Sequence, residues 1–197
     1  MGAISGIMVE LKKSKNELFT WSNMSRLAKI NWNDATNGNG VCVSIFLQGC
    51  PHHCPGCFNQ ETWDPAGGQP IDFPNFIREL IDKIQENDVE RGLSFLGGEP
   101  LVNYNLEFVD KVITIIKAIY PSTPVYIWTG DIYEHHEQDA RYNPVLRHIL
   151  SLTDVLIDGP YQEDKRDITL YLRGSSNQRV INVQQSLQKG ETVLLCD

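Results

Sequence analysis

The amino-acid sequence predicts an α/β fold, arranged as an open, partial (β/α) barrel with a mostly parallel sheet. From Lys29 onward, short apolar runs rich in β-branched residues alternate with longer segments whose apolar residues recur at helical spacing. This alternation is typical of βαβ units, which build parallel sheets through right-handed crossovers. A closed eight-stranded barrel takes about 250 residues, and the chain has 197. We therefore expect an incomplete barrel, with its chemistry on the loops at the carboxyl ends of the strands.

Each expected element rests on a local pattern. β-Branched and aromatic residues indicate the strands, and Gly97 and Gly98 end the second of them. Asp72 and Pro74 are start signals for the first helix, and Pro121 closes the second. In chain order, we expect strands at residues 41–47, 93–96, 125–128 and 154–157, and helices at residues 74–87, 106–116 and 144–150.

The first part of the chain, residues 1–27, is rich in Lys and Ser and shows no clear period. We predict an N-terminal extension of unknown role there, either an appended hairpin or a disordered lead. The remainder, residues 28–197, is expected to form one domain.

Composition and charge narrow the class of function. The chain is 41% apolar and 21% charged, as ordinary soluble domains are. Its net charge of −8 argues against nucleic-acid binding as the main activity, because binding phosphates needs a basic surface. No apolar run approaches the roughly 20 residues that cross a bilayer, and the first residues lack the features of a secretory signal. We expect a cytoplasmic protein with neither membrane nor nucleic acid as a partner.

Three of the five cysteines lie close together, directly after the first core strand. Cys50, Cys54 and Cys57 have the spacing Cys-x3-Cys-x2-Cys on a loop that also contains Pro and Gly. Three thiolates on one loop can hold three corners of a four-iron cubane and leave the last iron open to a small molecule, whereas electron-transfer clusters usually have four cysteine ligands. The sequence therefore predicts a catalytic [4Fe–4S] cluster bound by these three cysteines.

Two other interpretations of the cysteine loop stay open. Zinc is an alternative if His52 or His53 supplies the fourth ligand, although separated ligand pairs are the more usual pattern. Purely structural cysteines are the other alternative. We interpret Cys42 and Cys196 as small hydrophobic residues or bystanders, and the two histidines as neighbours of the site or exposed side chains.

A second loop follows the second clear strand. Here Gly97 and Gly98 allow close approach of the backbone to a ligand, and Glu99 can accept hydrogen bonds from an ammonium group. Alone, the sequence Gly-Gly-Glu-Pro is also compatible with a plain turn. Its position after a strand, downstream of the cysteine loop, makes the combination specific.

With both loops considered together, the sequence resembles the radical S-adenosylmethionine (SAM) superfamily, in which these loops bind a [4Fe–4S] cluster and the methionyl amino group of SAM. Within it, the chain is similar to the anaerobic (class III) ribonucleotide reductase activating proteins. The matching stretches are residues 43–46 (VSIF), 49–64 (GCPHHCPGCFNQETWD), 95–101 (FLGGEPL), 128–130 (WTG), 154–161 (DVLIDGPY) and 173–183 (RGSSNQRVINV).

Two features depart from the superfamily pattern. Many members have an aromatic residue just before the third cysteine, where this chain has Gly56, with Phe58 just after Cys57. The resemblance therefore implies that the segment Gly56 to Phe58 contacts the adenine of SAM. The N-terminal extension has no counterpart in the family.

The resemblance implies an oxidoreductase that cleaves SAM reductively and generates a glycyl radical on the large subunit of the anaerobic reductase. Flavodoxin or a similar donor would supply the electron. Residues Gly97, Gly98 and Glu99 would position the methionyl end of SAM. Thr129 and Asp158, at the ends of later strands, would line the SAM pocket, or serve as caps.

The sequence leaves the roles of several other residues undecided. The polar loop from Arg173 to Arg179 is expected to meet the partner or SAM, or else to be a solvated loop. Trp128, like Trp63, is expected to pack rather than to bind, and His135 and His136 are expected at the surface. The rival functions are activation of another glycyl-radical enzyme of the pyruvate formate-lyase type, and a non-catalytic iron–sulfur or zinc protein.

Overall fold

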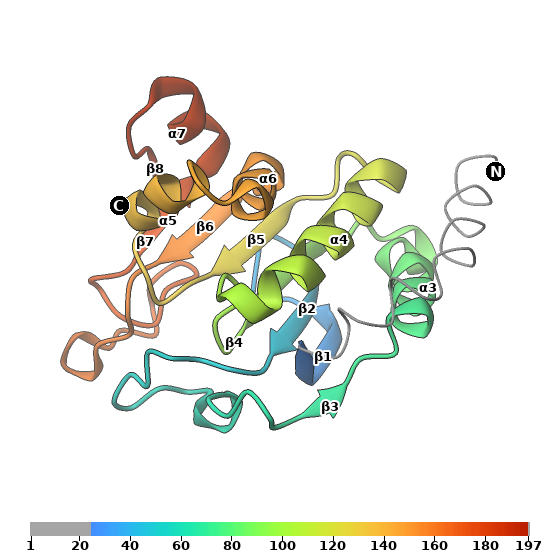
Figure 1. Cartoon of the computed structure of the whole chain (residues 1–197), viewed down its shortest axis with the longest axis horizontal. Coiled ribbons are helices and arrows are strands. Elements are labelled where there is room, and N and C mark those ends of the chain that lie inside the picture. Colours follow the sequence, from blue (N-terminus) through green and yellow to red (C-terminus); the bar gives the residue numbers. More distant parts are fainter. Residues whose placement is uncertain (1–24, 197) are drawn as a thin grey trace.

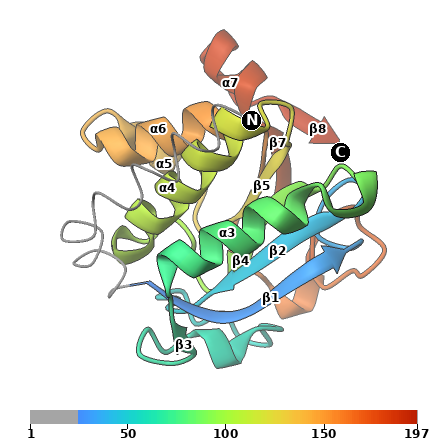
Figure 2. The ribbon, with the colours of Figure 1, turned by 90° about the vertical axis from the view of Figure 1, so that its right-hand side faces the viewer.

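The computed structural model describes residues 25–196 and has one eight-stranded sheet, ordered β3-β1-β2-β4-β5-β6-β7-β8 (Figure 1). Figure 2 shows α3, α4 and α6 side by side over one face of this sheet. The strands are β1 (Arg26–Asp34), β2 (Cys42–Leu47), β3 (Gln69–Pro70), β4 (Gly92–Gly97), β5 (Val125–Trp128), β6 (Val155–Asp158), β7 (Arg179–Asn182) and β8 (Leu194–Cys196). The helices are α3 (Phe73–Ile84), α4 (Asn103–Ile119), α5 (Tyr133–Ala140), α6 (Pro144–Leu152) and α7 (Val183–Lys189), with short 3-10 turns at Gln60–Thr62, Glu86–Asp88 and Glu163–Lys165.

The sheet is parallel at its centre and antiparallel at both edges. In the parallel part, β2, β4, β5 and β6, Ile45 lies opposite Phe95, and Phe95 lies opposite Ile127. At the edges, β1 and β3 pair antiparallel on one side, and β7 and β8 on the other. The predicted α/β fold is confirmed. Because β3 and β8 are the two ends of the strand order, the sheet is open.

Both faces of the central strands are covered, but by different amounts of apolar material. The helix-facing side of β2, with Val43, Ile45 and Leu47, belongs to the large core formed with α3, α4 and α6. The opposite face carries a smaller cluster of Cys42, Tyr126, Val155, Ile157 and Val180. Burial on both faces explains why β2 reads as a continuous apolar run rather than as an alternating one.

Side-chain caps fix where the helices begin. Asp72 accepts a hydrogen bond from Asn75 N, and Pro74 occupies the first turn of α3, as its start signals predicted. Asn143 accepts from the backbone of Val145 and Leu146 at the start of α6. The expected helices at 74–87, 106–116 and 144–150 therefore exist, with ends that differ by up to three residues.

Several elements were not expected from the sequence. The four outer strands, β1, β3, β7 and β8, are short or partly exposed, and α5 is mostly polar, so no apolar stripe indicated it. The expected boundary between residues 27 and 28 falls inside β1, and most of the expected extension lies outside the described residues. Among residues 25–196, no helix combines the length and apolarity that a bilayer span requires.

Candidate metal centre

The cysteine loop leaves β2 at its carboxyl end and returns to its own starting point. Gly49 N donates to Thr62 O at 2.7 Å, and Cys50 N donates to Trp63 O at 3.1 Å. Inside the loop, Cys57 N donates to Cys54 O at 3.1 Å. These bonds close the loop at its base, so the three cysteines lie on one compact segment at the end of a central strand.

The three thiols are free and half-buried. Burial raises the pKa of Cys50 to about 11 and also raises the pKa of Cys54, although the backbone N–H of Tyr161 lowers the latter. Because the thiolate is the ligand, metal binding would release these protons. Within residues 25–196, no three Cys, His, Asp or Glu side chains converge closely enough to hold a single ion. A cubane instead binds each cysteine at a different iron, so the donor set fits a cluster.

Neither histidine of the loop is placed as a fourth zinc ligand. His52 Nε2 lies 2.8 Å from Glu99 Oε2, and this hydrogen bond raises the pKa of His52. His53 turns to the other side, where its ring meets Trp63 edge-on at 4.8 Å between centroids. The expectation that both are neighbours of the site rather than ligands agrees with these positions.

The glycine loop lies directly against the cysteine loop. Gly98 N donates to Leu47 O, and Glu99 N donates to Gly49 O, both at 2.8 Å. A Cβ at Gly98 would lie 2.5 Å from Gly49 O, and Gly97 has a φ of +97°. The glycines are thus required for the close approach of two backbone segments, a reason that the sequence alone did not give.

The carboxylate of Glu99 is buried and accepts four hydrogen bonds from the protein. Oε1 accepts from Leu101 N at 3.0 Å. Oε2 accepts from His52 Nε2 at 2.8 Å, Gly130 N at 2.8 Å and Thr129 Oγ1 at 3.1 Å. Glu99 therefore joins the loops after β2, β4 and β5 at one point.

Thr129 extends this network into α5. Its hydroxyl donates to Glu99, so it must accept from His136 Nε2, which lies at 2.9 Å. His136 is buried, and burial lowers its pKa. The expectation that His136 lies at the surface is therefore wrong, because α5 docks and covers it, whereas His135 is exposed as expected.

Asp158 is fully buried at the carboxyl end of β6. Its Oδ2 accepts from Tyr133 N at 2.8 Å at the start of α5, and it forms an ion pair with Arg179 of β7. Arg179 also pairs with Glu134 at 2.7 Å. Asp158 therefore supports the start of α5 through this backbone bond, and its expected place in the SAM pocket stays a prediction.

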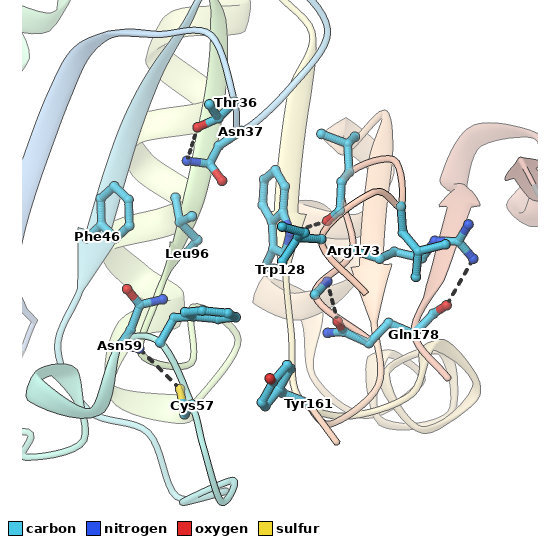
Figure 3. Close-up of a pocket in the computed structure, with 15 residues that line it drawn as sticks. Thr36, Asn37, Phe46, Cys57, Asn59, Leu96, Trp128, Tyr161, Arg173 and Gln178 are labelled. Carbon is cyan, nitrogen blue, oxygen red and sulfur yellow. Dashed lines mark hydrogen bonds between the residues drawn. The ribbon is translucent and has the colours of Figure 1, made fainter. Parts of the chain in front are cut away.

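A cavity of about 610 Å³ lies beside Cys57, at the carboxyl ends of β2, β4 and β5 (Figure 3). This volume is within the range of small-molecule pockets. Figure 3 shows Phe46, Leu96 and Cys57 on one side and Trp128 and Tyr161 on the other. The remaining lining residues are Thr36, Asn37, Phe58, Asn59, Ile168, Leu170, Leu172, Arg173, Gly174 and Gln178.

Part of this lining was missed in the sequence. Phe46 and Leu96 read as core residues, although their alternation with the helix-facing residues indicates that they face the other side. Tyr161 lies next to Phe58, with 5.5 Å between ring centroids. Trp128, expected only to pack, lines the cavity and donates from Nε1 to Leu172 O at 2.9 Å.

The polar loop that begins at Arg173 contributes one wall of this cavity rather than being fully solvated. Gln178 Oε1 accepts from Gly174 N at 2.9 Å and Ser175 N at 3.2 Å, so the loop is braced from within. Glu99 and His52 line a second, smaller cavity of about 450 Å³.

Comparison with known proteins identifies the family. Residues 36–181 match the model of the 4Fe-4S single cluster domain family. A protein of Escherichia coli (strain K12) is 36% identical over 149 residues, which cover 75% of this chain and 92% of the relative. Relatives from Pasteurella multocida (33% identical; 77% and 94% covered) and Enterobacteria phage T4 (34%; 75% and 87%) have the same name, anaerobic ribonucleoside-triphosphate reductase-activating protein. With its three-cysteine loop set against the glycine loop, the chain belongs to the family of anaerobic ribonucleoside-triphosphate reductase-activating proteins.

Proposed function

We propose that this chain is a radical SAM enzyme that activates an anaerobic ribonucleotide reductase by generating a glycyl radical on its large subunit. The observation that carries the proposal is the position of Cys57, which belongs to the three-cysteine loop and also lines the cavity of about 610 Å³. A cluster on that loop would have a small-molecule cavity at its side. The names of the relatives supply the reductase as the partner.

The residues present fit the cofactors. Cys50, Cys54 and Cys57 would each hold one iron of a [4Fe–4S] cluster and leave the fourth iron for SAM. When bound, the cluster would supply the electron for reductive cleavage of SAM, and the resulting 5′-deoxyadenosyl radical would remove hydrogen from a glycine of the reductase. Flavodoxin or a similar small protein is the proposed electron donor.

The chain's own residues would orient SAM and exclude water. Gly97, Gly98 and Glu99 are the proposed methionyl side, with Thr129 supporting Glu99 through its hydroxyl. The segment from Gly56 to Phe58 is the proposed adenine side, with Cys57 and Phe58 among the residues that line the cavity. Apolar side chains of Phe46, Leu96 and Trp128 would keep water from the reacting atoms.

The test is a comparison of anaerobically reconstituted wild type, Cys54→Ala and Cys42→Ala. Cys42 is a buried free thiol of the smaller apolar cluster, away from the loop, and serves as the matched control. We expect wild type and Cys42→Ala to bind about four irons, to cleave SAM under strong reduction and to produce a glycyl radical on the reductase, detected by electron paramagnetic resonance. Cys54→Ala should do none of these. A single bound zinc, or a radical formed only on pyruvate formate-lyase, would contradict the proposal.

A further inference from the structure

His52 lies between two of the proposed cluster ligands, yet its side chain leaves the loop. Its Nε2 meets the carboxylate of Glu99 at 2.8 Å, and its ring packs against Gly130. A Cβ at Gly130 would lie 2.5 Å from Cδ2 of this ring. The ring is therefore fitted between the loops that follow β4 and β5, although a quarter of the side chain remains exposed (25%).

Glu99 is the fixed point to which His52 is attached. Its side chain is 5% exposed, and its position is determined by three further donors, Leu101 N, Thr129 Oγ1 and Gly130 N. A buried carboxylate with this many donors resists displacement, because any shift leaves charged or polar groups unpaired. Because Glu99 is fixed, its hydrogen bond to His52 also restricts the position of the His52 side chain.

We infer that His52 is a positioning residue, which holds the cluster-binding loop in register with the Gly97–Glu99 loop through its hydrogen bond to Glu99. This inference rests on the proposed function, since it gives His52 a role in placing the cluster beside SAM. His52 would bind neither iron nor SAM. Its contribution is the orientation of the segment between Cys50 and Cys54, because none of the backbone–backbone hydrogen bonds of the described residues begins or ends at residues 51–53.

The chain offers a matched control in the next residue. His53 lies on the same loop and is exposed, but its ring faces Trp63. Replacing His53 therefore changes the composition of the loop without touching Glu99. Gln and Asn at position 52 form a second matched pair, because the Gln amide reaches about as far as Nε2 of His, whereas the Asn amide is one methylene shorter.

The experiment compares wild type, His52→Gln, His52→Asn, His52→Phe and His53→Gln after anaerobic reconstitution. Iron content, SAM affinity by equilibrium dialysis, the electron paramagnetic resonance spectrum of the reduced cluster with and without SAM, and the rate of SAM cleavage are measured. Circular dichroism of each apoprotein reports whether the variant is folded.

We expect all five proteins to bind the same amount of iron. His52→Asn and His52→Phe should lose about 10- to 100-fold in SAM cleavage, the usual effect of removing a partner that orients metal ligands, and their spectra should respond less to SAM. His52→Gln and His53→Gln should stay within about threefold of wild type. If His52→Phe fails to fold, the difference between Gln and Asn carries the test.

Three outcomes would overturn the inference: loss of iron in His52→Asn to the extent seen in Cys54→Ala, equal activity of the Asn and Gln variants, or an equal loss in His53→Gln. Failure of the proposed function is distinct from all three, because wild type itself would then lack a cluster or leave SAM intact.

Discussion

The two faces of the central sheet differ in how completely they are filled. The helix-covered face packs side chains of α3, α4 and α6, with a few from α5 and α7, into one continuous apolar core. The opposite face has five buried residues in its apolar cluster and adjoins the cavity beside Cys57. Stability thus comes mainly from one face, and the incompletely filled face is where a cofactor can be bound.

Truncating the filled face should give the largest effect. Ile113 of α4 is fully buried in the large core, so Ile113→Ala should lower the free energy of unfolding by about 2–5 kcal/mol. Leu96→Ala, beside the cavity, should cost less than Ile113→Ala, because part of its surroundings is already empty. Urea unfolding of the apoproteins measures both. Equal losses of unfolding free energy in the two variants would contradict the statement that the helix-covered face contributes most of the stability.

A smaller effect is expected where two loops touch. Gly98→Ala would force its Cβ onto Gly49 O, and we expect about 1–3 kcal/mol of destabilisation and reduced iron binding. Gly174→Ala is the control on the other wall of the cavity, where the nearest atom belongs to the ring of Tyr161 at 3.3 Å and can move. Urea unfolding and iron content should show a loss for Gly98→Ala, whose Cβ meets backbone, and little change for Gly174→Ala, whose Cβ meets a side chain.

At the mouth of the cavity, the expected effect falls on binding rather than on folding. Phe58 is 59% exposed and contacts only Tyr161 and Arg166 among the ring and cation–π contacts of the described residues. Phe58→Ala should therefore leave the unfolding midpoint unchanged and raise the Kd for SAM about 2- to 10-fold, the scale of one aromatic contact. An unchanged Kd would contradict the prediction that Phe58 contacts the adenine of SAM.

The smallest effect is expected at low pH. It concerns the ion pair between Glu134 and Arg179, which joins α5 to β7. The hydrogen bond from Arg179 lowers the pKa of Glu134 to about 2, against a reference value of 4.5. The pair therefore adds stability above that reference value, and the contribution is lost as the pH falls from about 4.5 to about 2. Glu134→Gln should show less loss of stability across this window. Urea midpoints of wild type and variant as a function of pH provide the measurement, and parallel curves would contradict the assignment.

The local part of the structure was predictable from the sequence. Each of the four central strands is an apolar run bounded by turn residues, and the spacing of Cys50, Cys54 and Cys57 indicates shared ligation whatever the fold. The two loops were expected at the carboxyl ends of strands, where the structure has them.

The part of the structure that the sequence did not predict depends on contacts between segments far apart in the chain. The outer strands β1 and β7 are defined by their pairing with β2 and β6 rather than by their own composition. His136 is buried only because α5 docks onto the loop that contains Thr129. No sequence pattern relates His52 to Glu99, which are 47 residues apart.

Two of the hydrogen bonds between the cysteine loop and the glycine loop come from backbone atoms, Gly98 N to Leu47 O and Glu99 N to Gly49 O. These two bonds depend on the length of the chain between the strands and not on side-chain identity, unlike the bond from His52 to Glu99. Point substitutions at exposed positions such as Pro51 or Pro55 would leave these two bonds intact. Insertion of one residue between Leu47 and Gly49 would break both backbone bonds at once, which no substitution at an exposed position of the loop does.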